Sequence, residues 1–405
     1  MNVMNRKAAG FLALAGVLAP SLASANLLID DGGEHEFNFP TLVSVLLNNN
    51  SALNIGSGGS IVGDGTNLAT FLSRGALSSL PGSNSSIRVF GDGHIFAGGD
   101  RYAIARAFAG NLFLAGNSAV TGDIFGYATV SPPFGSALQT FIANNARVEG
   151  NIFSDGRIRI SDNAVITGNL FEANGGIALD MDGGTIMGHV GAGSLVGHSA
   201  LITGGSILGG YGGNSSNIDF SIHGGQIDGG WSVYSQDMLV EVRGGEINGG
   251  MRFSGNVDTN STGDQVSLFS GAINAAAGEW LLDFASSFDL GDATSFDCSA
   301  NTSRFDIWGG QLGAGSAGNG IRLDVCATLD VYGTNLSYSG GLLSGFLADG
   351  SLLNVSVTEE SRWSGAVRLH DTAVPEPGTL GLLGVALGAM AMTRRRRRQT
   401  DNLQP

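Results

Sequence analysis

Two arginines in the middle of the chain have the spacing of a charged strand face. Arg157 and Arg159 alternate with Ile158 and Ile160, so a strand here would bury the isoleucines and turn both guanidinium groups outward. On a β-sheet face, arginines with nearby acidic residues suit an enzyme that removes the proton next to a carboxylate of an acidic polysaccharide. The acidic residues that such a reaction needs cannot be assembled from the sequence, so we expect no enzyme activity.

Two aspartates have the same alternating spacing a little further along. Asp180 and Asp182 flank Met181, and carboxylate oxygens are ligands that Ca²⁺ prefers. The rest of a calcium-binding loop is missing from the sequence, and so are zinc patterns, nucleophile elbows and nucleotide-binding loops. We therefore expect a solvated strand face, with no catalytic residue, no cofactor and no metal site.

A pattern of paired glycines repeats at a fixed interval and indicates how these strands are positioned. It begins at Gly204 and recurs after 20 and 40 residues, with an isoleucine in the same place of each copy, at Ile207, Ile227 and Ile247. Apolar residues at alternate positions predict strands with one buried face, and the glycines mark turns. Twenty residues cannot bury such a face alone, whereas stacked copies pair their strands and share one core.

We therefore predict an all-β fold, a right-handed parallel β-helix (a β-solenoid). The alternative is a β-sandwich or jelly roll, which also uses many short strands but does not explain three copies in register. Weaker copies of the pattern extend the predicted solenoid over residues 106–350. Since an open solenoid needs capped ends, we expect an N-terminal cap and irregular first coils in residues 26–105 and a C-terminal cap or linker in residues 351–373.

The composition supports a turn-rich acidic protein. Glycine occupies 66 of 405 positions, charged residues make up 14%, and the formal net charge is −15. Ordinary soluble domains have roughly 7% glycine and about 25% charged residues. An acidic surface repels nucleic acid, so we expect no nucleic-acid partner. Cys298 and Cys326 are expected to form a disulfide in an oxidising exterior, although two unpaired thiols are the alternative.

The first 25 residues have the three parts of a secretory signal peptide. Arg6 and Lys7 form a basic start, and an apolar stretch over residues 8–19 follows. Ala23 and Ala25 then provide the small residues of a cleavage site. This order of segments predicts export of the chain, with residues 1–25 removed.

The far end has three elements in order. The first is the tripeptide Pro375, Glu376 and Pro377, and the second is the apolar run 379–392, for which we expect a single short helix. The third is a block of five arginines: Arg394, Arg395, Arg396, Arg397 and Arg398. The helix would be about 21 Å long against a hydrocarbon core of about 30 Å, so it spans only marginally. The arginines are expected to stop transfer and stay cytoplasmic.

These three elements over residues 374–405 resemble the PEP-CTERM sorting signal. Proteins with such tails are recognised by exosortase, a membrane-embedded transpeptidase-like enzyme, and occur in Gram-negative bacteria that make extracellular polysaccharide. The resemblance implies an exosortase substrate that is anchored transiently in the inner membrane. It also implies a final place at the outer surface of the cell envelope or in the extracellular matrix.

We expect a non-catalytic surface or matrix protein that associates with extracellular polysaccharide in a biofilm. The glycine-rich repeats are similar to those of exported β-helix proteins. One alternative function is a polysaccharide-active β-helix enzyme of the lyase kind. The other alternative is a passive rod that binds calcium or carbohydrate.

Overall fold

The structure is a computed structural model that describes most of the region between the two termini. The described residues are 27–42, 44–48, 50–63, 75–79, 85–98, 102–107, 110–127, 138–192, 198–214, 218–234, 238–253, 264–284, 303–314, 319–323, 327–359 and 366–372. In this part of the chain every regular element is a β-strand. The short helix predicted near the C-terminus lies outside the described residues, as do both cysteines.

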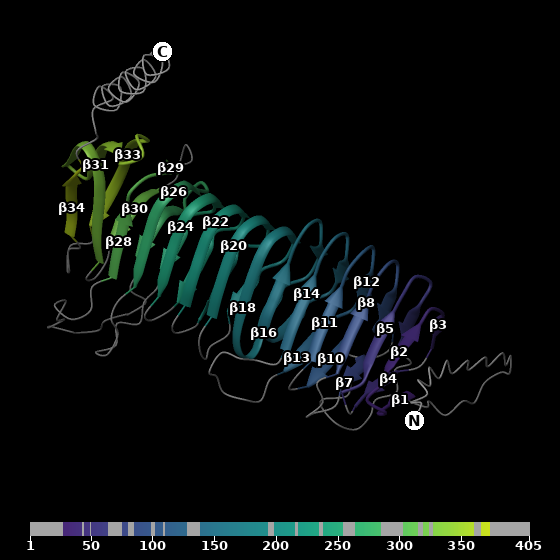
Figure 1. Ribbon diagram of the computed structural model, residues 1–405. Helices are drawn as coiled ribbons and strands as arrows, with labels where there is room; N and C mark the ends of the chain where they lie inside the picture. The colour runs from purple at the N-terminus through teal and green to yellow at the C-terminus, as the bar shows by residue number, and fades with distance from the viewer. Residues whose placement is uncertain are drawn as a thin grey trace, which may run out of the picture.

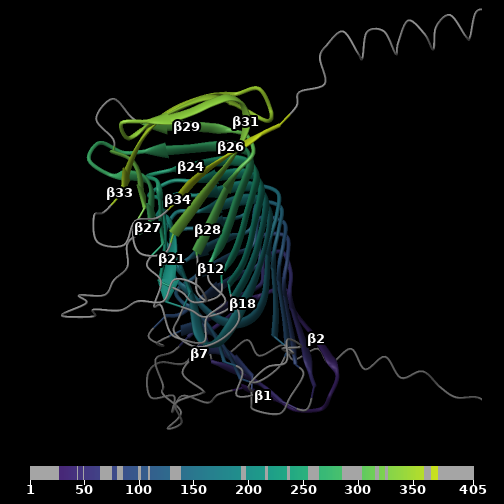
Figure 2. The same cartoon turned by 90° about the vertical axis from the view of Figure 1, so that its left-hand side faces the viewer.

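The described strands wind into a rod of stacked coils (Figures 1 and 2). Strands that occupy the same position in successive coils pair in parallel and form three ladders along the rod. The parallel β-solenoid predicted from the sequence is therefore confirmed, while its right-handed sense stays a prediction. These ladders are already present in residues 27–98, although the coils there differ in length.

Ladder one contains a strand from every coil. Its members are β1 (Leu27–Ile29), β4 (Val45–Leu47), β7 (Gly75–Ser79), β10 (Tyr102–Ala107), β13 (Ile124–Tyr127), the first parts of β16 (Ile152–Ile160) and β18 (Leu170–Ile186), β19 (Val190–Ala192), β21 (Tyr211–Asn214), β23 (Trp231–Tyr234), β25 (Met251–Phe253), β27 (Trp280–Phe284), β30 (Asn319–Leu323) and the end of β33 (Leu352–Glu359).

Ladder two runs beside it and carries the candidate site described below. Its members are β2 (Glu34–Phe37), β5 (Ala52–Ile55), β8 (Ser86–Val89), β11 (Gly110–Leu114), β14 (Leu138–Ile142), later parts of β16 and β18, the first parts of β20 (His198–Ile207), β22 (Ile218–Ile227), β24 (Leu239–Asn248) and β26 (Gln265–Ala275), then β28 (Ser303–Ile307), the start of β31 (Ala327–Ser339) and β34 (Ala366–Asp371).

Ladder three completes the coils up to β29. Its members are β3 (Pro40–Thr41), β6 (Ser60–Val62), β9 (His94–Phe96), β12 (Ala119–Thr121), β15 (Arg147–Glu149), β17 (Val165–Ile166), the last parts of β18, β20, β22, β24 and β26, and β29 (Gln311–Ala314). The long strands bend from ladder two into ladder three at a break in register, as β22 does near His223.

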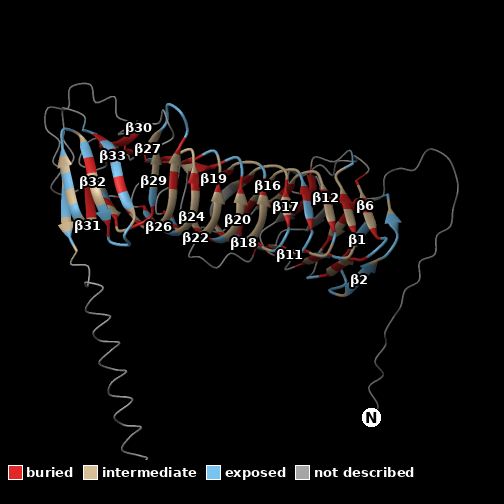
Figure 3. Ribbon diagram, turned by 90° about the horizontal axis from the view of Figure 1, so that it is seen from above, coloured by how far each residue is buried: buried red, intermediate tan, exposed pale blue. Residues whose placement is uncertain are grey.

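The core fills the inside of the rod with columns of apolar side chains, a column being the set of residues that hold one place in successive coils. Ile207 pairs with Ile227, and Ile227 pairs with Ile247. All three side chains have 0% exposure, so the predicted isoleucine column is confirmed. Fully burying one such side chain stabilises the fold by about 1.5–3 kcal/mol. Figure 3 shows that buried residues occur in strands along the whole length of the rod.

The C-terminal end of the rod departs from the parallel pattern. The second half of β31 pairs antiparallel with β32 (Leu342–Leu347), and β32 pairs antiparallel with β33. This three-stranded segment buries Leu343, Leu347 and Leu353 against the rod. Strand β34 then returns to ladder two and pairs in parallel with β31.

Candidate functional site

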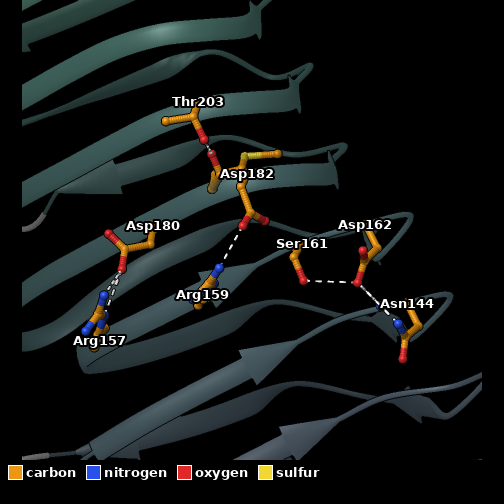
Figure 4. Close-up of polar contacts among 9 residues, drawn as sticks. Asn144, Arg157, Arg159, Ser161, Asp162, Asp180, Asp182 and Thr203 are labelled. Atoms are coloured by element: carbon orange, nitrogen blue, oxygen red, sulfur yellow. Dashed lines mark hydrogen bonds and ion pairs between the residues drawn. The ribbon is translucent and has the colours of Figure 1, made fainter.

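The two arginines and two aspartates singled out in the sequence lie side by side on the outer face of ladder two (Figure 4). The Nε atom of Arg157 donates a hydrogen bond of 2.8 Å to Oδ2 of Asp180. One step along the same strands, Nη2 of Arg159 donates a hydrogen bond of 2.8 Å to Oδ2 of Asp182. Ile158 and Ile160 of β16 are fully buried, so the arginines that alternate with them point outward. Met181 of β18 is buried in the same way between the two aspartates.

These contacts form two ion pairs at the surface, each between one arginine and one aspartate. The hydrogen bond to Asp182, with the charge of the same carboxylate, raises the pKa of Arg159 above its ordinary value. Each residue of the second pair keeps 41–50% of its side chain exposed, so water screens the attraction between the two charges and the pair adds little to stability. The aspartate oxygens and the guanidinium groups are therefore engaged with each other. In the described part of the chain no group of three or more His, Cys, Asp or Glu side chains is placed to hold a metal ion.

A shallow hollow of about 570 Å³ opens beside the second pair, with Arg159, Asp162 and Asp182 in its wall. Oδ2 of Asp162 accepts hydrogen bonds from the backbone N–H of Asn144 at 3.0 Å and from the hydroxyl of Ser161 at 3.2 Å (Figure 4). Asp162 and Asn144 both have positive φ, so this carboxylate holds two stacked turns in place. The polar groups at this hollow serve the local structure.

A second groove has a floor of glycines. It measures about 560 Å³, and its floor includes Gly225, Gly245 and Gly271 from successive coils. A Cβ atom added to Gly245 would lie 2.7 Å from the carbonyl oxygen of Gly225, so glycine is required for the coils to approach here. Because the same turn repeats in successive coils, the groove runs along the rod from the coil of Gly225 to that of Gly310. Its walls contain Glu246, Gln311, Asp349 and Ser351.

A row of amide and carboxylate side chains runs beside this groove on ladder three. Oδ1 of Asp228 accepts hydrogen bonds from Gln226 at 2.7 Å and from Asn248 at 2.9 Å. The amide of Asn274 donates to Asn248 at 2.9 Å and to Glu246 at 2.8 Å. This row was not predicted from the sequence, although the 20-residue spacing of Asp228 and Asn248 is a visible signal. A chain of polar groups next to a side-chain-free floor suits a ligand rich in hydroxyl groups.

A third cluster near the C-terminal end was also missed. Nε2 of His370 lies 2.6 Å from Oδ1 of Asp330, and Arg304 bonds both Asp306 and the Tyr332 hydroxyl. Burial, followed by the charge of Asp306, raises the pKa of Tyr332. The contact of Arg304 with Tyr332 spans 28 residues and that of Asp330 with His370 spans 40. Only the coil register of β28, β31 and β34 brings these residues together.

Aromatic rings extend this cluster into a stack along the rod. The rings of Trp308 and Tyr332 lie 3.5 Å apart with an interplanar angle of 4°, and His370 stacks on the far side of Tyr332 at 4.5 Å. Phe269 continues the stack toward the N-terminus, where Arg243 lies over its ring. Because each ring covers the face of the next, the stack stabilises the coils and leaves few ring faces for a sugar.

The other residues predicted to matter lie outside the described part of the chain. They are Ala23, Ala25, Cys298, Cys326, Pro375, Glu376, Pro377 and Arg394–Arg398. The disulfide and the signal cleavage site therefore stay predictions. Between Leu27 and Thr372, the described segments include no helix of the length and apolarity that a membrane crossing requires.

The comparison with protein families decides what the C-terminal segment is. Residues 373–398 match the PEP-CTERM protein-sorting motif. The chain carries a PEP-CTERM sorting motif. The resemblance predicted from the sequence is thereby confirmed. A search of curated proteins and of solved structures finds no match to the chain.

The PEP-CTERM motif indicates the cellular route of the protein. The motif indicates an exported protein that is anchored transiently in a membrane before cleavage. It implies processing by exosortase, which is a membrane enzyme. Strand β34 ends at Asp371 and the motif begins at residue 373, so the last strand that the structure describes lies directly before the motif.

Proposed function

We propose that this chain is a non-catalytic protein of the outer cell surface or extracellular matrix of a Gram-negative bacterium. Residues 1–25 would direct its export, and an exosortase-type enzyme would sort it through the PEP-CTERM motif. The observation that carries this proposal is the position of the motif, directly after the last strand of a long rod. In this role the rod is the cargo that reaches the envelope, and its outer faces are the surfaces that meet the matrix.

The glycine-floored groove supports an association with extracellular polysaccharide. Its floor is repeated in successive coils, so a linear polymer that lies along the rod meets the same contacts several times. Its wall and the neighbouring row offer mainly amide and carboxylate groups, which hydrogen-bond hydroxyl groups and repel polyanions. We therefore propose a neutral, hydroxyl-rich polysaccharide as the partner.

A localisation experiment tests the sorting half of the proposal. Cells that produce the full chain are compared with cells that produce a chain lacking residues 374–405 and with cells that produce the P375A/E376A/P377A variant. We expect the full chain in the envelope or matrix fraction. We expect both variants to be lost from that fraction. Removal of Gln399–Pro405 is the matched control, because these residues lie outside the matched segment 373–398. Unchanged fractions for all variants would rule the sorting function out.

A binding experiment tests the polysaccharide half. Ala272 lies in the groove, so Ala272→Trp would fill it from an outward position. We expect this variant to lose at least about tenfold in affinity for soluble dextran in affinity electrophoresis, since a repeated contact is blocked. Thr185→Trp is the control, because Thr185 belongs to the same ladder outside the groove. Equal mobility of the wild-type chain with and without dextran and other neutral glucans would contradict the proposal.

The alternative function is a lyase-like polysaccharide enzyme, and one observation favours it. The imidazole of His370 is oriented by the carboxylate of Asp330 at 2.6 Å, which is the arrangement of many general bases. Incubation of the protein with acidic polysaccharides, with detection of new unsaturated chain ends, tests this alternative. Their formation by the wild-type chain and their loss in His370→Gln would replace the non-catalytic proposal.

A further inference from the structure

Ladder two has an edge strand at each end of the rod. Within the described residues, β2 pairs only with β5, and β34 pairs only with β31. Each of these strands therefore presents one row of backbone N–H and C=O groups that no described strand covers. Such an edge is a template for a further strand unless the protein blocks it.

The core column behind these strands is also incomplete at both ends. It begins at Phe37, which pairs with Ile55, and it ends at Leu369, which pairs with Val331. The members between them are fully buried, and Ile55 and Val331 both have 0% exposure. Leu369 has 39% exposure and Phe37 is half-buried. Each end therefore lacks the neighbour that every inner coil provides.

The outward column next to it ends in opposite charges. Glu36 begins this column and Arg368 ends it, and both side chains are exposed. Glu36 contacts Asn38 through a hydrogen bond of 2.9 Å, and no ion pair of Arg368 occurs among the described residues. Other apolar side chains are exposed at the N-terminal end, with Phe39 at 55% and Leu42 at 74%.

We propose that a second copy of this chain is the occupant of these edges. Its β2 pairs in parallel with β34 of the first copy, so that the rods join end to end. Because the coil register is fixed, continuing the core column from Leu369 to Phe37 places Arg368 beside Glu36 and forms an ion pair. The contact uses a different surface on each copy, so it repeats without closing and builds a filament. The join uses strands of the rod alone and does not depend on how residues 373–398 are processed.

Association of the protein as recovered from the producing cells tests this inference. Sedimentation velocity and electron microscopy of negatively stained samples measure mass and rod length over a range of concentrations. We expect rods whose lengths are multiples of one rod and increase with concentration. A single length and a monomeric mass at all concentrations would overturn the inference. Mass spectrometry of the same samples reports where the chain ends, so a failure of processing is seen separately from a failure to associate.

Charge reversal locates the contact. Glu36→Arg and Arg368→Glu each place like charges at the join, so each is expected to weaken association by about tenfold or more. The double variant E36R/R368E restores the ion pair and is expected to restore association. Asp219→Arg is the matched control, because Asp219 is an exposed residue of β22 in the middle of the rod. If the single variants associate as strongly as the wild type, or if the double variant does not recover association, these edges do not meet.

Discussion

The backbone N–H of Gly310 donates a hydrogen bond of 2.7 Å to Oδ2 of Asp349, which lies 39 residues later in the chain. The other carboxylate oxygen accepts a hydrogen bond of 2.9 Å from the backbone N–H of Ser351. This one side chain ties the antiparallel segment at the C-terminal end to the last glycine turn of the rod. Burial alone would raise the pKa of Asp349, but the hydrogen bonds from Ser351 and Gly310 outweigh it and lower the pKa.

Replacing Asp349 by alanine should loosen this end of the rod. We expect a loss of about 1–3 kcal/mol in the free energy of unfolding at neutral pH, since two N–H groups lose a charged acceptor. Because the pKa of Asp349 is lowered in the folded state, its contribution is present above the ordinary value of 3.8 and is lost as the pH falls below it. The difference in thermal midpoint between wild type and Asp349→Ala should therefore shrink toward pH 3. Asp371→Ala, at an exposed position of β34, is the control.

The isoleucine column should be sensitive to truncation. Ile227 has 0% exposure between Ile207 and Ile247, so Ile227→Ala leaves a cavity in a continuous core. We expect a loss of about 2–5 kcal/mol in the free energy of unfolding, measured by urea denaturation. Leu208→Ala is the matched control, since Leu208 is 43% exposed. Similar losses for the two variants would mean that the column does not carry the stability of the coils.

Much of the fold could be predicted from the sequence because the central coils have equal length. Ile207, Ile227 and Ile247 stand 20 residues apart, and the structure stacks them. The first coils have no such signal, since Leu27 pairs with Val45 and Val45 pairs with Leu77. Their strands join the same ladders, but the unequal connections hide the repeat. Sequence spacing identifies a solenoid only where its loops are constant in length.

Similar motifs also proved to occupy different ladders. The segments that end in Phe113 and Phe125 look like two copies of one repeat. The structure pairs Phe113 with Phe141 in ladder two, whereas Phe125 pairs with Phe153 in ladder one. A strand on any side of a coil needs the same glycine and apolar residues, so local sequence does not tell which side it forms.

The candidate site was predictable only in part, and the reason is register. Arg157 and Asp180 were both singled out from their spacing, yet their pairing across 23 residues was not visible. Arg157 lies opposite Ala178 in the ladder, and Asp180 is reached diagonally. The contact of His370 with Asp330 spans 40 residues and depends on two intervening antiparallel strands. The alternation of apolar and polar residues in a strand shows on which face of the sheet a residue lies. To predict which residue it contacts in the next coil, the length of every loop between the two must be known.

The glycine turns offer a test that separates backbone strain from steric contact. Gly245 has a φ of +81°, and an added Cβ atom would meet the carbonyl oxygen of Gly225 at 2.7 Å. Gly278 has a similar φ of +85°, but nothing lies within 4 Å of its added Cβ atom. We expect Gly278→Ala to lose about 1–2 kcal/mol in the free energy of unfolding, from the left-handed conformation alone.

Gly245→Ala should lose more than Gly278→Ala, because the coils must also separate, and overpacking of this kind adds about 1–3 kcal/mol. Thermal denaturation of both variants measures the difference. Equal losses would show that the close approach of successive coils at the groove floor does not constrain the fold.

Tyr338 makes the C-terminal segment sensitive to alkali. Its hydroxyl donates a hydrogen bond of 2.9 Å to Oε1 of Glu359. Burial, together with this hydrogen bond, raises the pKa of Tyr338 to about 12 from an ordinary value of 10.0. A raised pKa in the folded state contributes stability that is complete below pH 10 and is lost as the pH rises toward 12. The thermal midpoint of the wild-type chain should therefore fall across this interval.

Two variants assign that fall to this tyrosine. Phenylalanine in Tyr338→Phe cannot ionise, so the midpoint of this variant should fall less between pH 10 and 12, and its tyrosinate absorbance should lack one component that appears above pH 10. Glu359→Gln removes the neighbouring negative charge, which is a smaller cause of the raised pKa than burial. The Tyr338 hydroxyl should therefore titrate at a lower pH in Glu359→Gln, but still above 10. A titration of Tyr338 that Glu359→Gln leaves unchanged would mean that burial alone holds the proton on this hydroxyl.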